Sequence, residues 1–368
     1  MTASRRLVAR VHLWLGLILG LVWALQGLTG AALVFHRELD RLGVKAATGP
    51  MAPVDLVLAN AERAAGAPVR MLGVADARGD VLTAIYSRAD GREGVLRIEA
   101  ATGRVIDDRE AGTGWRWVYE LHEELLLHDR GKTLVGTSGL FLLSAALTGL
   151  WIGWPKRRAW RVAVRPRLWR STRARLYGWH RLSGLLVTLA LVVLPLAGAA
   201  MAFGTSLRPW LSEVAGFRMP YKAEGPSPAQ PVPAGRALTA AKAAFPNARF
   251  VRLTMPSETS PAYHVRLLQP GEVRRWSGTT AVTVDAGTGA VLARYDALRA
   301  PLANRLYDAA FPVHSGEVAG LPGRVLVMLA GLALPTLYVT GLLAWWRKRK
   351  VRAIPVASHT GGYRPSAA

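Results

Sequence analysis

Residues 11–35 read VHLWLGLILGLVWALQGLTGAALVF and contain no Asp, Glu, Lys or Arg. About 20 consecutive apolar residues are enough to cross a hydrocarbon layer roughly 30 Å thick. A chain that crosses lipid must satisfy its own backbone hydrogen bonds, so we expect a helix here. Three further stretches share this composition and length, at 133–154, 182–207 and 325–346. The sequence therefore predicts a polytopic α-helical membrane protein with four transmembrane helices.

The basic residues are distributed unevenly around these stretches. The chain has 47 Lys and Arg against 24 Asp and Glu, a formal net charge of +23. Segments 1–10, 155–181 and 347–368 hold 19 of the basic residues and none of the acidic ones. The positive-inside rule places these segments, and with them both termini, in the cytoplasm. This distribution argues against a nucleic-acid-binding face and favours contact with the anionic headgroups of the lipid bilayer.

The two long segments between the apolar stretches show short alternating apolar runs with turn residues, which are typical of antiparallel strands. A helix-compatible run precedes the strands in each, at 54–65 and 236–244. Each segment is therefore expected to form a small α+β module. The predicted division is a cytoplasmic amino terminus over 1–10, helices over 11–35, 133–154, 180–207 and 322–346, periplasmic modules over 36–132 and 208–321, an Arg-rich cytoplasmic loop over 155–179 and a cytoplasmic tail over 347–368.

The two halves of the chain resemble each other. Thr148–Trp151, near the end of the second apolar stretch, matches Thr340–Leu343 at an offset of 192 residues. The first and third apolar stretches align at an offset of 168 residues. We interpret this as an internal duplication of a helix, module, helix unit. The two offsets pair His12 with His180, Gly30 with Gly198, and His122 with His314.

The paired histidines are the main candidates for chemistry. His12 and His180 lie at the cytoplasmic ends of their helices, whereas His122 and His314 precede the second helix of each unit on the outer side. A neutral imidazole is an axial ligand of haem iron, and apolar helix surfaces enclose the porphyrin. Two pairs at opposite leaflets are what two bis-His haems of the b type would need. No other motif identifies a catalytic side chain, and the absence of cysteine excludes disulfides and thiolate chemistry.

The remaining histidines have no equivalent in the repeat. His36 lies at the outer end of the first apolar stretch and is an alternative outer ligand. His128 is open as a solvated residue, a substrate contact or a replacement outer ligand. His264 in a strand pattern and His359 in the polar tail are expected to be structural or solvated. Gly16, Gly20 and Gly184, beside the histidines, are expected to let a flat macrocycle or another helix approach the backbone. Polar residues within the spans are expected to hydrogen-bond between helices, among them Thr29, Thr148 and Thr340.

Six short motifs occur in order along the chain: His12–Gly16, Leu28–Ala31, Phe35–Asp40, Leu121–His122, Trp179–Gly184 and Val313–Gly316. With these motifs the chain resembles the PepSY-associated transmembrane family over residues 7–350. The Thr-Gly turns at 102–103 and 288–289 also resemble those of PepSY domains. The resemblance implies a bacterial inner-membrane protein with two periplasmic PepSY-like modules, of a kind often associated with iron uptake.

Some members of this family are similar to di-haem reductases that release iron from ferric siderophores at the periplasmic face. The resemblance thus implies a transmembrane reductase of a ferric siderophore or another Fe(III) chelate. No flavin or nicotinamide domain is fused to the chain, so the electron donor is expected to be a cytoplasmic flavoprotein or a membrane quinol. The alternative is a non-enzymatic PepSY membrane protein that binds or restrains a periplasmic partner such as a peptidase. A siderophore permease is disfavoured because no charged residue lies inside any span.

Overall fold

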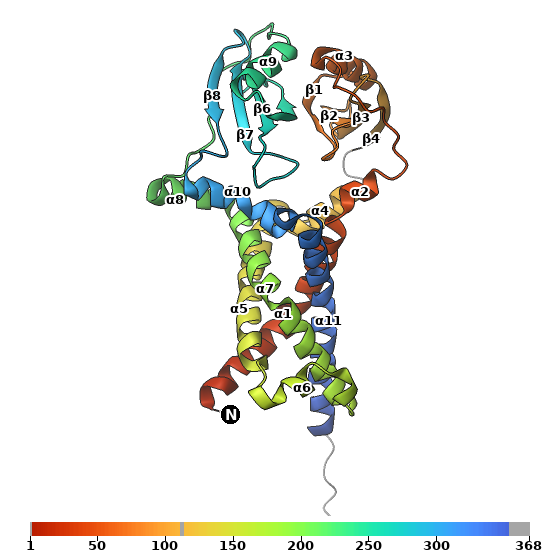
Figure 1. Ribbon diagram of the computed structural model, residues 1–368, viewed down its shortest axis with the longest axis vertical. Helices are drawn as coiled ribbons and strands as arrows, with labels where there is room; N and C mark the ends of the chain where they lie inside the picture. The colour runs from red at the N-terminus through yellow and green to blue at the C-terminus, as the bar shows by residue number, and fades with distance from the viewer. Residues whose placement is uncertain (1, 111–113, 353–368) are drawn as a thin grey trace, which may run out of the picture.

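The protein has two parts, a bundle of long helices and a head made of a β-sheet and two helices (Figure 1). The computed structural model describes residues 2–110 and 114–352. The first helix begins and the last helix ends at the end of the bundle that lies away from the head. We call this the terminal end of the bundle, and the opposite end the head end.

The described residues contain four helices that are long and apolar enough to cross a membrane. The four transmembrane helices predicted from the sequence are thereby confirmed as candidate spans. With 26 to 33 residues each, they are about 39–50 Å long, so their ends extend beyond a hydrocarbon layer of about 30 Å. They are α1 (Ala3–Leu33), α5 (His128–Gly153), α7 (Thr172–Ala202) and α11 (Gly320–Arg352).

Small residues allow the helices of the bundle to pack closely. α1 and α11 cross where Gly27 faces Gly331, and neither position has room for a side chain. Contacts of this kind are typical of helices in membranes, where association depends on close packing rather than on exclusion of water. Ser171 caps the start of α7, and its hydroxyl accepts a hydrogen bond from Ala174 N at 3.1 Å. This N-cap adds helical turns in the part of the chain predicted as the Arg-rich loop.

Several shorter helices lie at the two ends of the bundle. α4 and α10 lie at the head end of the bundle, and neither was predicted from the sequence (Figure 1). Each ends shortly before a membrane helix begins, and each carries one of the candidate histidines. The connecting helices are α2 (His36–Asp40), α4 (Trp115–Glu124), α8 (Gly204–Ala215) and α10 (Leu302–His314) at the head end, and α6 (Trp160–Ala163) at the terminal end.

The head contains two modules with the predicted order of a helix followed by antiparallel strands. At the first Thr-Gly turn Gly103 has φ +71°, and at the second Gly289 has φ +77°, a conformation that glycine adopts without strain. The first module comprises α3 (Val54–Ala65), β1 (Val69–Val74), β2 (Val81–Ser87), β3 (Glu93–Glu99) and β4 (Val105–Glu110), and the second α9 (Ala234–Ala244), β5 (Arg249–Thr254), β6 (Ala262–Leu268), β7 (Thr280–Asp285) and β8 (Val291–Tyr295).

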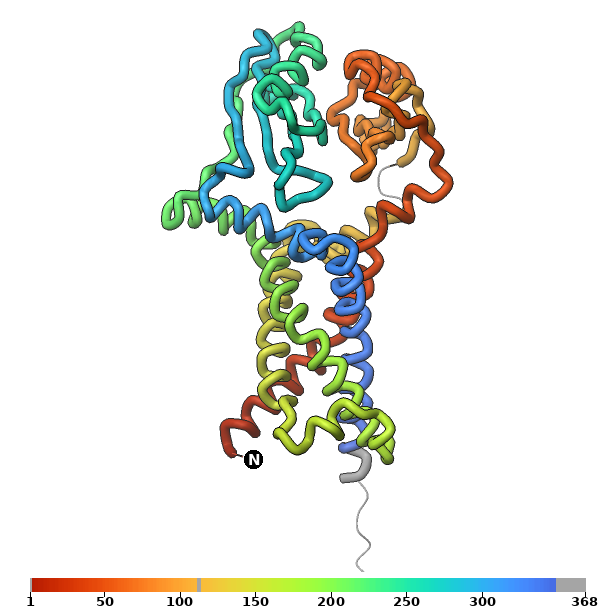
Figure 2. The backbone as a smooth tube through the Cα atoms, in the orientation of Figure 1, coloured from red at the N-terminus to blue at the C-terminus, as the bar shows by residue number. Residues whose placement is uncertain are grey.

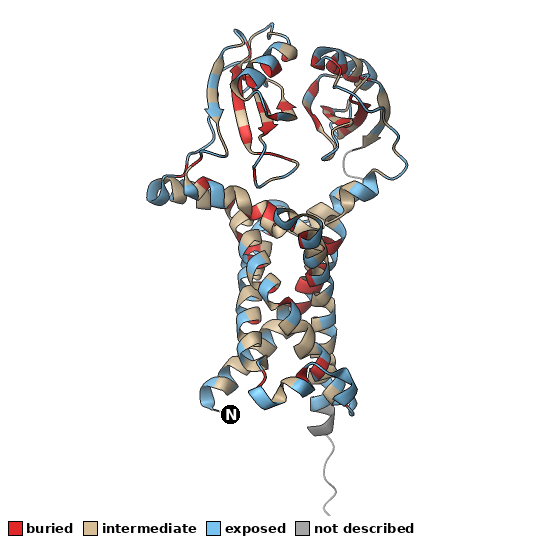
Figure 3. Ribbon diagram, in the orientation of Figure 1, coloured by how far each residue is buried: buried red, intermediate tan, exposed pale blue. Residues whose placement is uncertain are grey.

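The two modules share one sheet, which differs from the prediction of two separate units. Among the described strands the order is β4-β3-β2-β1-β5-β6-β7-β8, with β1 and β5 joined through pairs such as Leu72 and Leu253. An unpaired first strand in each module would leave exposed backbone donors and acceptors, and pairing the two satisfies both edges. Leu72, Leu253, Val57 and Val282 belong to one buried cluster beneath α3 and α9. In Figure 3 buried residues gather on the helices and the sheet of the head.

Candidate functional site

The structure brings together the two members of each expected histidine pair. His12 of α1 and His180 of α7 form the terminal-side pair, with ring centres 6.2 Å apart. His122 of α4 and His314 of α10 form the head-side pair, with ring centres 6.1 Å apart. The rings are inclined at 82° in the first pair and 53° in the second. Each pair thus takes one histidine from each half of the chain.

A neighbouring helix fixes the orientation of both terminal-side imidazoles. His12 Nδ1 lies 3.0 Å from the carbonyl oxygen of Ala145, and His180 Nδ1 lies 3.0 Å from that of Leu337. A carbonyl oxygen only accepts hydrogen bonds, so Nδ1 carries the proton in both rings. The hydroxyls of Thr148 and Thr340 lie 3.3 Å from the same two nitrogens. Nε2 of each ring is thereby left as the unprotonated nitrogen, which is the one that can bind a metal.

The head-side imidazoles are held in the same way. His314 Nδ1 donates to the carbonyl oxygen of Leu194 at 2.8 Å. His122 Nδ1 lies 3.0 Å from Thr29 Oγ1, whose own hydroxyl proton is directed to carbonyl oxygens of α1. Burial lowers the pKa of His122 to about 4 and also lowers the pKa of His314. Both rings are therefore neutral at pH 7, as metal ligation requires.

A glycine on the adjacent helix lies directly against each of the four imidazoles. A β-carbon at Gly149 would lie 2.8 Å from Cε1 of His12, and one at Gly30 would lie 2.8 Å from Cε1 of His122. The corresponding distances are 3.2 Å from Gly341 to His180 and 3.1 Å from Gly198 to His314. Carbon atoms in ordinary contact are about 3.5–4.0 Å apart. The absence of a side chain at these four positions is what allows the rings to occupy their places.

The two pairs are separated by most of the thickness of a membrane. His12 and Gly30, which contacts His122, are 18 residues apart on α1, a rise of about 27 Å. His180 and Gly198, which contacts His314, have the same separation on α7. Because the hydrocarbon core is about 30 Å thick, the pairs lie near its two faces.

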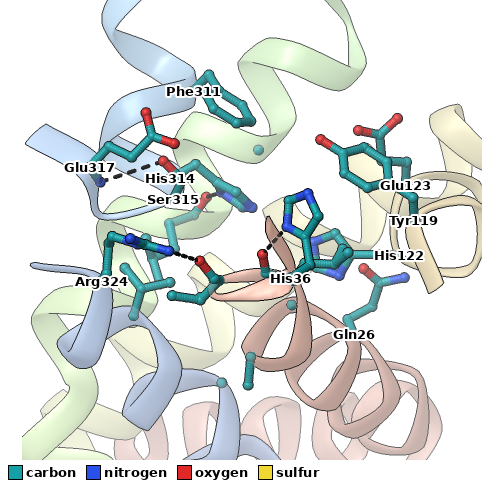
Figure 4. Close-up of a pocket in the computed structure, with 18 of the residues that line it drawn as sticks. Gln26, His36, Tyr119, His122, Glu123, Phe311, His314, Ser315, Glu317 and Arg324 are labelled. Atoms are coloured by element: carbon teal, nitrogen blue, oxygen red, sulfur yellow. Dashed lines mark hydrogen bonds between the residues drawn. The ribbon is translucent and has the colours of Figure 1, made fainter. Parts of the chain in front are cut away.

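A large cavity lies beside the head-side pair. It has a volume of about 1010 Å³, at the upper end of the range for small-molecule sites, and His122, His314 and His36 lie in its wall. Figure 4 shows the two histidines of the pair within this cavity, with Phe311 and Tyr119 nearby. Its deeper part is lined by apolar residues of α1, α7 and α11, and its upper part by charged residues.

Charged and aromatic residues tie the elements around the upper part of the cavity together. The Arg37 guanidinium lies 3.0 Å from the centre of the Trp276 ring, and the Trp276 indole donates to Glu317 at 2.6 Å. Burial lowers the pKa of Arg37 to about 10. Arg324 of α11 pairs with Glu38 of α2 at 2.5 Å. These contacts hold α2, the loop between β6 and β7, and the start of α11 in one layer above the head-side pair.

The other histidines do not join either pair. The His36 ring lies at a steep angle to those of Trp115 and Tyr119, with ring centres 5.9 and 6.2 Å away, and its Nδ1 lies 2.5 Å from a carbonyl oxygen of α1. The structure therefore places His122 rather than His36 opposite His314. The side chain of His128 is 88 % exposed, which fits the solvated alternative. His264 lies in β6 with its Nδ1 3.3 Å from Thr283 Oγ1, and His359 lies outside the described residues.

The glycines singled out beside the histidines are not those that contact the rings. Gly20 packs against Tyr338, Gly184 has only an ordinary contact with Leu337, and Gly16 has no atom within 4 Å of an added β-carbon. The contacting glycines follow Thr29, Thr148 and Thr340 in three of the four cases, and these threonines reach the histidines. The Thr-Gly pairs at 148–149 and 340–341 were visible as markers of the repeat. That these glycines contact the imidazole rings could be seen only from the packing of the helices.

Comparison with known proteins identifies the family of the chain. A family model described as the PepSY-associated TM region matches residues 9–348. The chain belongs to the PepSY-associated transmembrane family. The match includes all four histidines of the two pairs, both modules of the head and almost all of the bundle. A comparison of this PepSY-associated transmembrane protein with curated proteins found no match.

Proposed function

We propose that this membrane protein binds one haem b at each histidine pair and carries electrons across the bacterial inner membrane to a ferric chelate, such as a ferric siderophore. The observation that carries the proposal is the spacing of the rings. Metal–imidazole nitrogen distances are about 2 Å, so two imidazoles on opposite sides of one metal have ring centres about 6 Å apart. The two pairs are spaced at 6.2 and 6.1 Å.

The surroundings of each pair also suit a porphyrin. Two imidazoles are too few ligands for a bare metal ion, which takes four or more, whereas a porphyrin supplies four ring nitrogens. The Nδ1 hydrogen bonds of His12, His180 and His314 to backbone carbonyls are the outer contacts that metal-bound histidines usually make. Cys is absent, which excludes thiolate ligation, and the four paired imidazoles would hold the haem iron. Apolar residues of α1, α7 and α11 line the cavity beside His122 and His314.

The charge distribution supports the direction of electron flow. The terminal end of the bundle carries the basic segments 1–10 and 155–181, which favour the cytoplasmic side, so the head lies in the periplasm. The terminal-side pair then faces a cytoplasmic flavoprotein or membrane quinol as donor, and the head-side pair faces the substrate. Haem, when bound, supplies reversible one-electron transfer. The Fe(III) substrate takes up one electron, and its oxygen-rich chelator holds the resulting Fe(II) less tightly.

The contacts of the histidines support an internal duplication. His12 packs against Gly149, and His180 packs against Gly341 in the same way. The two contacts are equivalent in the repeat, because the offset of 168 residues relates His12 to His180 and the offset of 192 relates Gly149 to Gly341. The contact of His122 with Gly30 is carried onto that of His314 with Gly198 in the same way. A duplicated unit of one helix, one module and one helix would thus supply half of each site.

A reduction assay tests the proposed function. The protein in lipid nanodiscs is reduced with dithionite, freed of excess reductant and mixed with Fe(III)–EDTA, while Fe(II) is trapped by a coloured chelator. We expect the stored electrons to appear as Fe(II) in the wild type and His264→Ala, which alters a histidine of the sheet. His122→Ala should lose most of this transfer. Equal Fe(II) release by wild type and His122→Ala, or none from a haem-loaded wild type, would contradict the proposal.

A further inference from the structure

Two arginines lie on the face of the sheet opposite to α3 and α9, and a third lies close to them in a loop. Arg252 of β5 and Arg266 of β6 are directly opposed in the antiparallel pair between these strands. Side chains in such positions have β-carbons about 5 Å apart, and like charges there destabilise the sheet. Arg274, in the loop at 269–279, is close enough to both for its charge to act on theirs. We call these residues the arginine cluster.

The acidic groups nearest the arginine cluster, Asp308 and Glu272, form no ion pair with it. Among the described residues, no carboxylate lies within 4.0 Å of a side-chain nitrogen of the three arginines. Asp308 accepts the hydroxyl of Tyr295 at 2.7 Å, and Glu272 accepts Gln269 N at 2.8 Å. Burial lowers the pKa of Arg266 to about 10; the charges of Arg252 and Arg274 add to this effect, and those of Asp308 and Glu272 oppose it. Half-buried, unpaired like charges are costly, so their persistence needs a reason.

Arg274 connects the arginine cluster to α10, the helix that carries His314. The loop at 269–279 reaches from the sheet towards α10 (Figure 2). Within it, Arg274 donates to the carbonyl oxygen of Asp308 at 3.2 Å, and its guanidinium carbon lies 5.2 Å from the centre of the Phe311 ring. Phe311 lies in the wall of the head-side cavity, three residues before His314 on the same helix. An anion held by the cluster would therefore sit beside this cavity.

We propose that Arg252, Arg266 and Arg274 form a binding site for a negatively charged, carboxylate-bearing chelate of Fe(III). Guanidinium groups bind carboxylates through paired hydrogen bonds in a fixed planar geometry, which favours arginine over lysine in such sites. An anionic ligand also removes the mutual repulsion of the three charges. This inference rests on the proposed function, because it names the charge class of the substrate for the same cavity.

A redox-inert probe separates the binding site from the reduction. Ga(III)–EDTA carries one negative charge, has the size of its iron counterpart and accepts no electron. Its binding to the full chain in nanodiscs is measured by calorimetry. We expect the dissociation constant to rise at least about tenfold in Arg266→Gln and further in Arg252→Gln/Arg266→Gln. The matched control is Arg249→Gln, which removes an exposed charge from β5, the strand of Arg252. This variant should bind Ga(III)–EDTA as the wild type does.

A neutral probe and a stability measurement complete the test. The neutral complex of Ga(III) with three maltolates should bind all variants alike and weakly. Removal of Arg266 relieves repulsion, so the melting temperature should stay equal or rise while Ga(III)–EDTA binding falls; a purely structural arginine would show the reverse. Equal Ga(III)–EDTA binding by wild type and Arg252→Gln/Arg266→Gln would overturn the proposal. Binding that follows the arginines in a protein that fails to reduce iron would keep this site and reject the reductase.

Discussion

Replacement of Gly149 by alanine should displace the His12 imidazole. The added β-carbon would lie 2.8 Å from Cε1 of His12, whereas carbon atoms in contact need about 3.5–4.0 Å. The ring must therefore move by about 0.7–1.2 Å. The hydrogen bond from Nδ1 to the Ala145 carbonyl starts at 3.0 Å, and a movement of this size takes it beyond hydrogen-bond distance. The same displacement removes the ring from its place opposite His180.

The magnitude follows from three contributions. Overpacking costs about 1–3 kcal/mol, and the lost hydrogen bond costs about 0.5–1.5 kcal/mol. Alanine returns about 1 kcal/mol because it favours the helix more than glycine does. We expect Gly149→Ala to lower the free energy of unfolding by about 0.5–3.5 kcal/mol. Gly153→Ala, one turn later on α5, is the control, because its β-carbon would have only an ordinary contact at 3.8 Å with Arg181.

The assay is denaturant unfolding in detergent micelles, followed by circular dichroism, in a double-mutant cycle. In a His12→Ala background the ring is gone, so Gly149→Ala should be neutral or stabilise the protein by up to about 1 kcal/mol. A coupling energy near zero between the two positions would refute the reasoning. So would a loss of stability in Gly153→Ala equal to that in Gly149→Ala.

Two further substitutions test contacts away from the histidines. Arg41→Gln should cost about 1.5–3 kcal/mol at pH 7, because Arg41 binds Asp76 and Asp80 with side chains that are 14–15 % exposed. Arg41 lowers the pKa of Asp80, so the difference in free energy of unfolding between variant and wild type should persist above about pH 4. This difference should vanish as the pH falls further, which unfolding curves at several pH values would show. Trp23→Phe removes the 3.1 Å hydrogen bond to the Ser138 carbonyl and should lower the free energy of unfolding by about 1–3 kcal/mol. The melting temperature should fall with it, and an unchanged melting temperature would argue against that contact.

The bundle and the histidine pairs could be predicted because their signals are local or repeated. Apolar stretches such as 11–35 have one stable form in lipid, and the offsets of the repeat place His12 with His180 without knowledge of the packing. The distance between the rings could not be predicted, because it depends on how α1 and α7 cross. The ring contacts of Gly149 and Gly341 depend on the same crossing.

The head shows where sequence reasoning stops. The strands and Thr-Gly turns were recognisable, but the pairing of β1 with β5 joins residues about 180 positions apart. Nothing in either strand alone specifies that partner. α4 and α10 were missed because a short helix at a membrane surface has no long apolar run. The opposition of Arg252 and Arg266 likewise appears only once the register of β5 and β6 is known.

The ratio of haem to chain tests the central claim most directly. It is measured on the purified protein, made with ample haem, from reduced-minus-oxidised absorption spectra calibrated against protein mass. We predict two b-type haems per wild-type chain, and one each in His12→Ala and His122→Ala, with His264→Ala retaining both. A folded wild-type protein without haem, or paired-histidine variants that retain two haems, would contradict the account.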